Sequence, residues 1–239
     1  MAALSETSGQ GASPLPAVGD TEVDTTFTPI YKFLRVLVRG LNRLMFRTTV
    51  EGLELVPTEG PMIIAPVHRS GIDFFVASEV TGRKLHYMAK DSLWKRPRFG
   101  RFLQTIGAFP VHRDAADREA LRRAQRVLDA GEVLVLFPEG ERRTGPVVKD
   151  LHQGVAFLSA RTGAPVVPVG IGGSTSVMPK GAKFPRPRHI HLVVGTPIPA
   201  PAKTEAGRVP RSQLTAMTDE LTTTIQTLYD RSVASTGRY

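Results

Sequence analysis

The sequence predicts an α/β fold in which a mixed, mostly parallel sheet is flanked by helices and preceded by an N-terminal amphipathic helix. Two observations support this prediction. Short apolar runs typical of buried strands alternate with longer segments of helical periodicity, and this alternation is typical of sheets built from parallel strands. The chain also has 239 residues and 41% hydrophobic content, which is enough for one domain with a full core.

The first segment, 1–26, is predicted to be a disordered leader. Residues 1–24 contain four acidic residues and no Lys or Arg, together with Ser, Gly and Pro. They do not resemble a signal peptide, because a basic start and an apolar core are both missing. The whole chain carries a formal charge of +9, so the part after the leader is more basic still. Such a charge requires an acidic partner: an anionic membrane, nucleic acid or an acidic carrier protein.

An amphipathic helix is predicted over 27–48, beginning at Thr28 and Pro29. Its apolar stripe consists of Ile30, Phe33, Leu34, Leu37, Leu41, Leu44 and Met45, and the basic residues alongside are Lys32, Arg35, Arg39, Arg43 and Arg47. Each central arginine costs about 2.5–3.5 kcal/mol to insert, so the helix is not expected to span a bilayer. We expect it to lie in a membrane interface; the alternative is a helix packed on the domain with a solvated basic face. A second basic and aromatic patch, 93–102, can reach the same surface.

The main domain is predicted to extend over 49–235, with helices that stop at Gly131 and Gly163. Strands are expected at 53–55, 62–67, 85–89, 108–111, 133–137, 166–171 and 190–194, and helices at 73–80, 114–130, 151–161 and 211–232. The glycine-rich run 170–174 matches neither a dinucleotide fingerprint nor a P-loop, so it is interpreted as a turn after a buried strand. The segment 184–188, which contains two prolines, is expected to be a loop.

His68 and Asp73 follow the apolar run 62–67 directly. A histidine that leaves a strand, with a carboxylate five positions later where a helix can begin, is one way to build an oriented general base. The carboxylate would bond one ring nitrogen and leave the other free to take a hydroxyl proton. The alternative is a loop histidine beside an aspartate that caps the helix.

Two further polar clusters also follow apolar runs. Arg113 ends the run 107–113, and Glu139, Gly140 and Arg142 come after the strand-like residues 133–136. Each cluster taken alone is compatible with an ordinary turn or helix start. The carboxyl ends of parallel strands meet at one edge of a sheet, so the three clusters can converge there.

Four ordered blocks, 68–73, 107–113, 137–142 and 167–171, make the sequence similar to the glycerolipid acyltransferase superfamily over about 50–195. Among its members it most resembles the lysophosphatidic acid (1-acylglycerol-3-phosphate) acyltransferases. The resemblance implies that a fatty acyl group passes from a thioester, on coenzyme A or acyl carrier protein, to a glycerol hydroxyl, giving phosphatidic acid for phospholipid biosynthesis. It also implies the residue roles: His68 matches the base, Asp73 its partner, Arg113, Glu139, Gly140 and Arg142 the acceptor-phosphate region, and Pro168 the fourth block.

The residue types suit this chemistry. A hydroxyl cannot ionise unaided at neutral pH, so it needs a base such as His68 within hydrogen-bond reach. Guanidinium groups bind two phosphate oxygens at once, which Arg113 and Arg142 can do. Lys149 is a third candidate, unless it is simply an exposed loop lysine. We expect Glu139 to hold an arginine in position. Position 141 is a small hydroxyl residue in most relatives, whereas Glu141 here puts a carboxylate beside the phosphate region.

Other function classes are poorly supported. The chain has no Gly-x-Ser-x-Gly elbow, no cysteine and no His-Glu-x-x-His pattern, so we expect neither a hydrolase of these types nor a metal site or cofactor beyond the acyl donor. Nucleic acid is not an expected partner, because an RNA-binding aromatic signature is missing. The expected place of action is the cytoplasmic face of the cell membrane, as a peripheral or monotopic protein. Acyl transfer to glycerol-3-phosphate or another lysophospholipid, and non-catalytic binding of anionic lipid, remain as alternatives.

Overall fold

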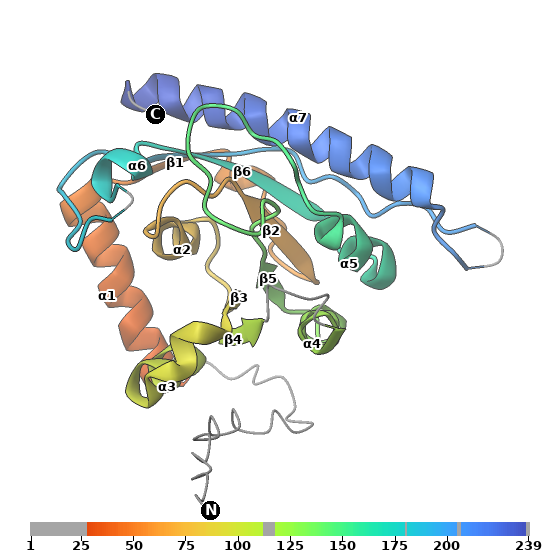
Figure 1. Cartoon of the computed structure of the whole chain (residues 1–239), viewed down its shortest axis with the longest axis horizontal. Coiled ribbons are helices and arrows are strands. Elements are labelled where there is room, and N and C mark those ends of the chain that lie inside the picture. The colour runs from red at the N-terminus through yellow and green to blue at the C-terminus, as the bar shows by residue number, and fades with distance from the viewer. Residues whose placement is uncertain (1–27, 112–117, 180, 205–206, 238–239) are drawn as a thin grey trace, which may run out of the picture.

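The computed structural model describes residues 28–111, 118–179, 181–204 and 207–237. Their strands form one seven-stranded sheet in the order β1-β7-β6-β2-β5-β3-β4, with helices packed around it (Figure 1). Neighbouring strands are parallel except for β6 and β7, which are antiparallel. The predicted mixed, mostly parallel sheet is therefore confirmed. The strands are β1 Thr49–Glu51, β2 Met62–Pro66, β3 Leu85–Lys90, β4 Ala108–Val111, β5 Val133–Val135, β6 Val166–Gly172 and β7 His191–Val194.

Seven α-helices and three short 3₁₀ helices accompany the sheet in the described ranges. The α-helices are α1 Pro29–Phe46, α2 Asp73–Val76, α3 Pro97–Thr105, α4 Arg118–Asp129, α5 Gly154–Thr162, α6 Ser174–Val177 and α7 Arg211–Thr236, and the 3₁₀ helices are η1 Leu53–Leu55, η2 Ala77–Glu79 and η3 Asp91–Lys95. Most predicted elements occur within a few residues of their expected bounds. The predicted leader 1–26 lies outside the described residues.

The local structure differs from the prediction at several places. Residues 53–55 form η1 and not a strand, because Gly52 adopts a left-handed φ of +83° and turns the chain out of β1. The helix predicted over 73–80 is divided into α2 and η2. Helix α3 was not predicted at all; it begins with Pro97, and it contains Gly100 where a Cβ would lie 2.7 Å from Trp94.

The centre of the sheet positions the polar clusters. Strand β2 lies between β5 and β6, with Ile63 opposite Leu134 and Ile64 opposite Val167, and its residues are buried. Because β2 and β5 are parallel and adjacent, their carboxyl ends meet at one edge of the sheet. The segments 68–73 and 137–142 therefore lie side by side, as the sequence predicts.

Helix α7 packs closely along β6. At Gly170 an added Cβ would lie 2.3 Å from the backbone of Leu228, and at Gly172 it would lie 2.2 Å from the carbonyl oxygen of Ser232. Only glycine lets a helix backbone approach a strand so closely. The interpretation of 170–174 as a turn was thus wrong: β6 continues through Gly172, and the glycines serve helix packing.

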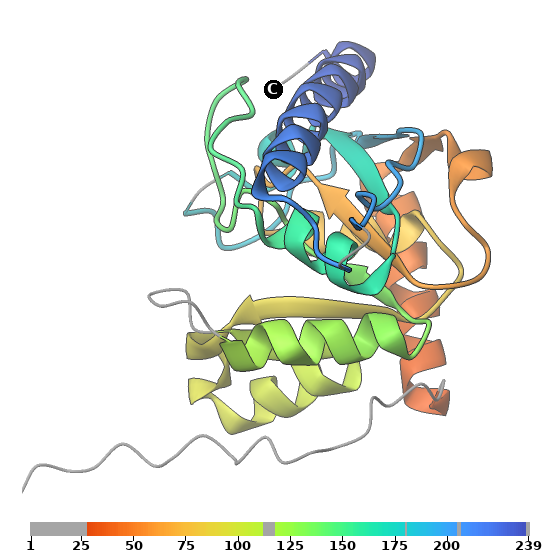
Figure 2. The same ribbon diagram turned by 90° about the vertical axis from the view of Figure 1, so that its right-hand side faces the viewer.

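Helix α1 runs along the outside of the domain, as Figure 2 shows at its right-hand side. Its N-cap is the predicted Thr28, whose Oγ1 accepts a hydrogen bond from the Tyr31 N–H. The carboxylate of Glu79, which is 4% exposed, lies 3.4 Å from Arg39 Nε and 3.7 Å from Arg43 Nε. A buried carboxylate needs such partners, so these arginines face the domain. The alternative of a packed helix with a solvated basic face is therefore wrong for this part of the basic stripe.

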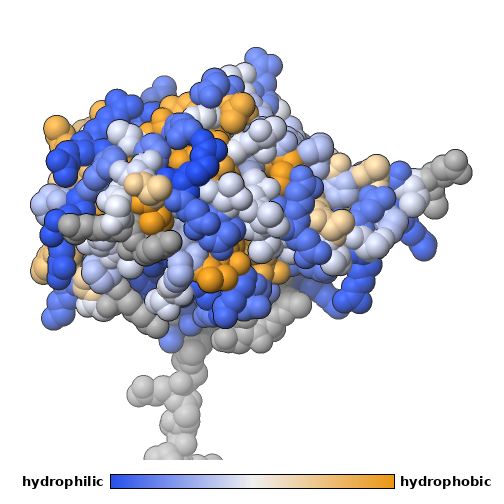
Figure 3. All heavy atoms as spheres, turned by 90° about the horizontal axis from the view of Figure 1, so that it is seen from above, coloured by the Kyte–Doolittle hydropathy of each residue, from blue (hydrophilic) through white to orange (hydrophobic). Residues whose placement is uncertain are grey.

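Several apolar side chains of α1 face solvent, whereas Tyr31 and Phe46 are buried and Leu34, Val38 and Met45 are partly buried. The exposed fractions are 63% for Ile30, 68% for Phe33, 71% for Val36, 55% for Leu37 and 85% for Leu44. No helix within the described ranges is both long and apolar enough to cross a bilayer. In the view of Figure 3, hydrophobic residues occur at the left-hand edge, interleaved with hydrophilic ones, on the side where Figure 1 places α1. Helix α1 thus leaves part of its apolar surface uncovered, and its arginines bind the buried Glu79 of the domain.

Candidate active site

His68 and Asp73 form a hydrogen-bonded pair beyond the carboxyl end of β2. The Nδ1 atom of His68 lies 3.2 Å from Oδ2 of Asp73, which is the first residue of α2. Asp73 is fully buried, and His68 is 9% exposed. Because Nδ1 faces the carboxylate, Nε2 is the ring nitrogen that remains for a substrate hydroxyl.

The loop between these two residues folds around the same carboxylate oxygen. Oδ2 of Asp73 also accepts hydrogen bonds from the backbone N–H groups of Arg69, at 2.7 Å, and Ser70, at 2.6 Å. These donors precede α2, and the side chain of Asp73 does not cap that helix. The carboxylate therefore stabilises the loop that carries His68, and the alternative of a helix-capping aspartate is wrong.

The segment that follows β5 holds His68 from the other side. The imidazole ring stacks on Phe137, with ring centroids 4.1 Å apart and planes at 27°. The backbone N–H of His68 donates to Oε2 of Glu139 at 2.8 Å, and its carbonyl oxygen accepts from the N–H of Arg143 at 2.9 Å. Both the ring and the backbone of His68 are consequently held in place.

Arg69 and Glu139 form a buried ion pair below the loop. Nη1 of Arg69 lies 2.6 and 2.7 Å from the two carboxylate oxygens of Glu139, which is fully buried. The remaining donors of Arg69 bind the carbonyl oxygens of Gly145 and Val147, both at 3.1 Å, and the guanidinium lies 5.1 Å from the ring centre of Tyr229. Glu139 does hold an arginine. Both of its carboxylate oxygens are occupied and shielded from solvent, so its part in substrate binding, through the groups it holds, stays a prediction.

The turn after Glu139 brings the guanidinium of Arg142 close to the catalytic loop. Gly140 has a φ of +68°, and an added Cβ would lie 2.6 Å from the His152 ring, so the position requires glycine. Arg142 is exposed, and its Nη1 lies 3.4 Å from the point where a Cβ of Gly71 would be. Among the predicted phosphate ligands, Arg142 is thus the one that the structure places beside the His68 loop.

The other predicted residues have different positions. Arg113 lies outside the described residues. Lys149 is exposed on the loop before α5. Pro168 is buried within β6, opposite Ala65, and packs in the sheet, while the part in substrate binding that its match to the fourth block implies stays a prediction. Glu141 is exposed, and its Oε1 lies 3.5 Å from Arg143 Nη1, which partly neutralises its charge.

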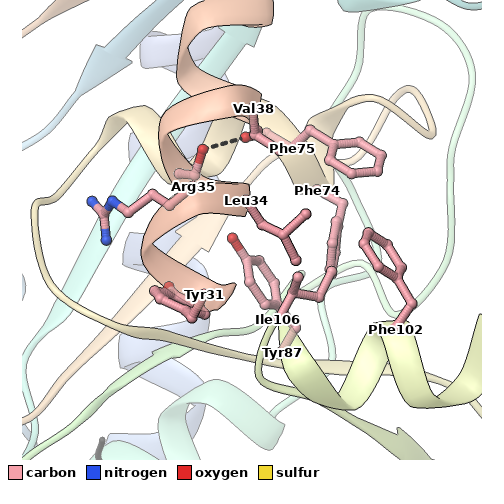
Figure 4. A pocket seen from close by; sticks show the side chains of 10 residues that line it. Tyr31, Leu34, Arg35, Val38, Phe74, Phe75, Tyr87, Phe102 and Ile106 are labelled. Atoms are coloured by element: carbon pink, nitrogen blue, oxygen red, sulfur yellow. Dashed lines mark hydrogen bonds between the residues drawn. The ribbon is translucent and has the colours of Figure 1, made fainter. Parts of the chain in front are cut away.

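An aromatic recess opens between α1, α2 and α3 (Figure 4). Its lining residues are mostly apolar: Tyr31, Leu34, Val38, Phe74, Phe75, Tyr87, Phe102 and Ile106, with Arg35 and Ser78. Phe74 and Phe75 follow Asp73 directly along the chain. Burial raises the pKa of Tyr87, which keeps its phenol neutral. The recess therefore has an apolar lining that includes the two residues directly after the His68 partner.

Comparison with known proteins agrees with this geometry. The family model described as Acyltransferase matches residues 47–172, which include six of the seven strands and both segments that hold His68. The chain belongs to the Acyltransferase family.

The acyltransferase is 26% identical, over 84% of its length, to a 1-acyl-sn-glycerol-3-phosphate acyltransferase of Bacillus subtilis, of which it covers 98%. It is also 26% identical to the chloroplastic enzyme of that name, BAT2, of Brassica napus, over 58% of this chain, but spans only 41% of that protein. A solved structure with a similar fold is the lysophosphatidic acid acyltransferase PlsC of Thermotoga maritima, with a TM-score of 0.68 and 23% identity over 88% of this chain and 81% of that one.

Several residues of the acyltransferase site were missed from the sequence. Arg69 stands inside the first block, where a charged residue in a loop suggests solvent exposure, yet it is 6% exposed. A signal for its role was the predicted need of Glu139 for an arginine. Phe137 was part of the third block but had no assigned role. The sequence contained almost no indication of the recess, because its lining residues come from four segments that are distant in the sequence.

Proposed function

We propose that this acyltransferase moves a fatty acyl group from acyl-CoA or acyl carrier protein to the free hydroxyl of 1-acylglycerol-3-phosphate, giving phosphatidic acid. The observation that carries the proposal is the His68–Asp73 pair, which leaves Nε2 of His68 for a hydroxyl and has the guanidinium of Arg142 beside its loop. The names of the relatives from Bacillus and Brassica support the choice of acceptor. In this proposal residues 49–235 carry the chemistry.

In the proposed reaction His68 acts as general base. Its Nε2 takes the proton of the acceptor hydroxyl while the hydroxyl oxygen attacks the thioester carbonyl carbon. The new C–O bond forms, the C–S bond breaks, and the proton passes to the departing sulfur to give a free thiol. Asp73 orients the ring and stabilises the imidazolium that forms in between, and its bond to the loop prevents the pair from separating.

Three cations are proposed for the acceptor phosphate: Arg142, with Arg113 and Lys149. Arg142 has the best support, because it is exposed and lies over the catalytic loop. A guanidinium at that position can bind two phosphate oxygens and bring the acceptor hydroxyl toward His68. Glu141 stands next to it, and its ion pair with Arg143 reduces the repulsion that its carboxylate would exert on a phosphate.

The aromatic recess is proposed to take the acyl chain of the donor. Phe74 and Phe75 continue from Asp73, so a chain lying along them would leave its thioester close to His68. Burying each methylene of that chain contributes about 0.8 kcal/mol, which favours long acyl groups. The end of the recess, near Phe102 and Ile106, would then limit chain length (Figure 4).

We further propose that the enzyme works at the cytoplasmic face of the cell membrane, with 27–48 lying in the interface. The uncovered apolar face of α1 supports this, because such a face is costly in water and suits the acyl region of a lipid leaflet. The roles of the arginines differ from those expected. Arg35, Arg39 and Arg43 bind the domain and set the orientation of α1, while exposed Lys32 and Arg47 remain for lipid phosphates.

The decisive experiment supplies the purified protein with acyl-CoA and 1-acylglycerol-3-phosphate and measures free thiol together with the lipid product. We expect stoichiometric thiol and phosphatidic acid, which His68→Ala and Asp73→Asn variants with native circular dichroism do not produce. Product from glycerol-3-phosphate alone would move the assignment to that acceptor. Thiol release without dependence on any acceptor, or none with any donor, would contradict the proposal. Replacing acyl-CoA by acyl carrier protein identifies the donor.

A further inference from the structure

The loop between α6 and β7 has an exposed aromatic residue surrounded by cations. Phe184 is 80% exposed, and Lys183, Arg186 and Arg188 are exposed beside it. We call residues 181–188 the Phe184 loop. The sequence contains no acidic residue between Asp150 and Glu205. Within the described part of the chain, none of the three cations of the loop forms an ion pair, so their charges are not neutralised by the fold.

This loop is attached to the catalytic loop. The side chain of Ser70 donates a hydrogen bond to the carbonyl oxygen of Met178 at 2.8 Å, and the sulfur of Met178 lies 3.9 Å from the position of a Gly71 Cβ. Farther along, the N–H of Arg186 donates to the carbonyl oxygen of Val177 at 2.8 Å. The Phe184 loop therefore lies beside the edge of the sheet where His68 and Arg142 are.

Two prolines and a backbone hydrogen bond restrict the Phe184 loop near its exposed tip. Pro185 and Pro187 restrict the backbone on either side of Arg186, and the hydrogen bond of Arg186 fixes its base. A stiff loop holds Phe184 out in water although the ring could lower its free energy by folding back. An aromatic tip with cations around it matches the boundary between acyl chains and headgroups of an anionic leaflet.

We propose that the Phe184 loop is a second membrane contact, which inserts Phe184 into an anionic lipid surface and places Lys183, Arg186 and Arg188 among the lipid phosphates. The inference rests on the proposed function in one respect, since a lipid acceptor gives the enzyme a reason to dock this edge. Figure 1 shows α1 and the segment around α6 on the same side of the domain, so one surface can contact both. The active-site edge then faces the leaflet that supplies the acceptor.

A fluorescent probe tests the contact without any turnover. The chain has one tryptophan, Trp94, which is 8% exposed. In a Phe184→Trp variant we expect the added emission to shift to the blue with vesicles of phosphatidylcholine and phosphatidylglycerol, and to be quenched by brominated acyl chains. A Phe157→Trp variant is the matched control, because Phe157 is 43% exposed on α5 and lies outside the loop. It should show neither effect.

A second variant measures how much the cations of the loop contribute to vesicle binding. Changing Lys183, Arg186 and Arg188 to Gln should weaken vesicle binding about fivefold per cation removed and reduce its salt dependence. Its KM for acceptor in vesicles should rise, while kcat for a short-chain, monomeric acceptor stays at the native value.

Specific outcomes would overturn the docking proposal. An emission of the Phe184→Trp variant that does not respond to anionic vesicles would do so, as would a response to acidic acyl carrier protein alone. An equal loss of activity on monomeric and vesicle acceptors would show that the loop supports the active site and not docking. If the protein transfers no acyl group to any acceptor, the proposed function fails, and the fluorescence result still decides whether the loop binds lipid.

Discussion

The buried pair formed by Arg69 and Glu139 permits a quantitative prediction. Both side chains are shielded from solvent, at 1% and 0% exposure, and their closest atoms are 2.6 Å apart. Removing one partner leaves an uncompensated charge in the interior, which costs about 3–5 kcal/mol of unfolding free energy. We therefore expect Arg69→Met and Glu139→Gln to be strongly destabilised, although neither residue is expected to touch substrate.

The two single variants should lose different amounts of unfolding free energy. Arg69→Met also removes the hydrogen bonds to the carbonyl oxygens of Gly145 and Val147, which contribute about 1 kcal/mol each. Glu139→Gln keeps an oxygen that can accept the N–H of His68. Arg69→Met should thus lose about 2 kcal/mol more than Glu139→Gln. The double variant Arg69→Met, Glu139→Gln removes both charges, so it should be more stable than the sum of the single losses by about 1–3 kcal/mol.

Urea unfolding followed by circular dichroism at room temperature measures all four proteins of this cycle. Activity measured under native conditions gives a second readout, because Glu139 also accepts the backbone N–H of His68, and the neutral, weaker acceptor in the variants that carry Glu139→Gln should lower kcat. A double variant whose loss equals the sum of the two single losses would show that the charges do not interact. Single variants within about 1 kcal/mol of the native protein would show that water or another group compensates the remaining charge, and would refute the reasoning.

Four further predictions concern the site, the membrane and pH. His68→Ala should lower kcat at least about 10²-fold while the protein remains folded. Arg142→Ala should raise the KM for the phosphorylated acceptor about 10- to 150-fold, because a charge-assisted contact to phosphate contributes about 1.5–3 kcal/mol, and the KM for the donor should change little. Equal changes in both KM values would assign Arg142 a structural role. Replacing Leu37 and Leu44 together by Ser should weaken vesicle sedimentation at least about tenfold, whereas unchanged sedimentation would exclude α1 as an anchor. Burial, and after it the charges of His191 and Arg47, lower the pKa of His189. Below about pH 6.5 the folded chain therefore binds fewer protons at this site than the unfolded chain. The unfolding free energy should fall as the pH drops through this range, and it should fall less in a His189→Gln variant.

Much of the fold could be predicted because local patterns and burial agree in it. The run 62–67 is apolar throughout because β2 is covered on both faces, and such continuous runs are typical of central parallel strands. Thr28 and Pro29 start α1 by local capping, which depends on a few neighbouring residues. Where a residue responds to distant partners, prediction failed: Gly170 and Gly172 resemble turn residues, and only the approach of α7 explains them.

The orientation of α1 on the domain could likewise not be predicted from the sequence. Periodicity identified an apolar stripe and a basic stripe, yet it could not say which one faces the domain. That choice depends on Glu79, whose buried carboxylate lies more than thirty residues from the arginines that it attracts. An apolar stripe usually turns inward, whereas here Arg39 and Arg43 pair with the buried Glu79 and part of the stripe, including Leu37 and Leu44, stays exposed.

The sequence by itself determined the type of fold, the two segments that meet at the sheet edge and the His68–Asp73 pair, because five residues of local chain bring these two side chains within reach. The tertiary structure alone decided how the neighbouring charges are used. Arg69 and Glu139 are 70 residues apart, and their attraction becomes strong only when β2 and β5 align and exclude water. The aromatic recess likewise exists only where four distant segments pack together, so no local pattern encodes it.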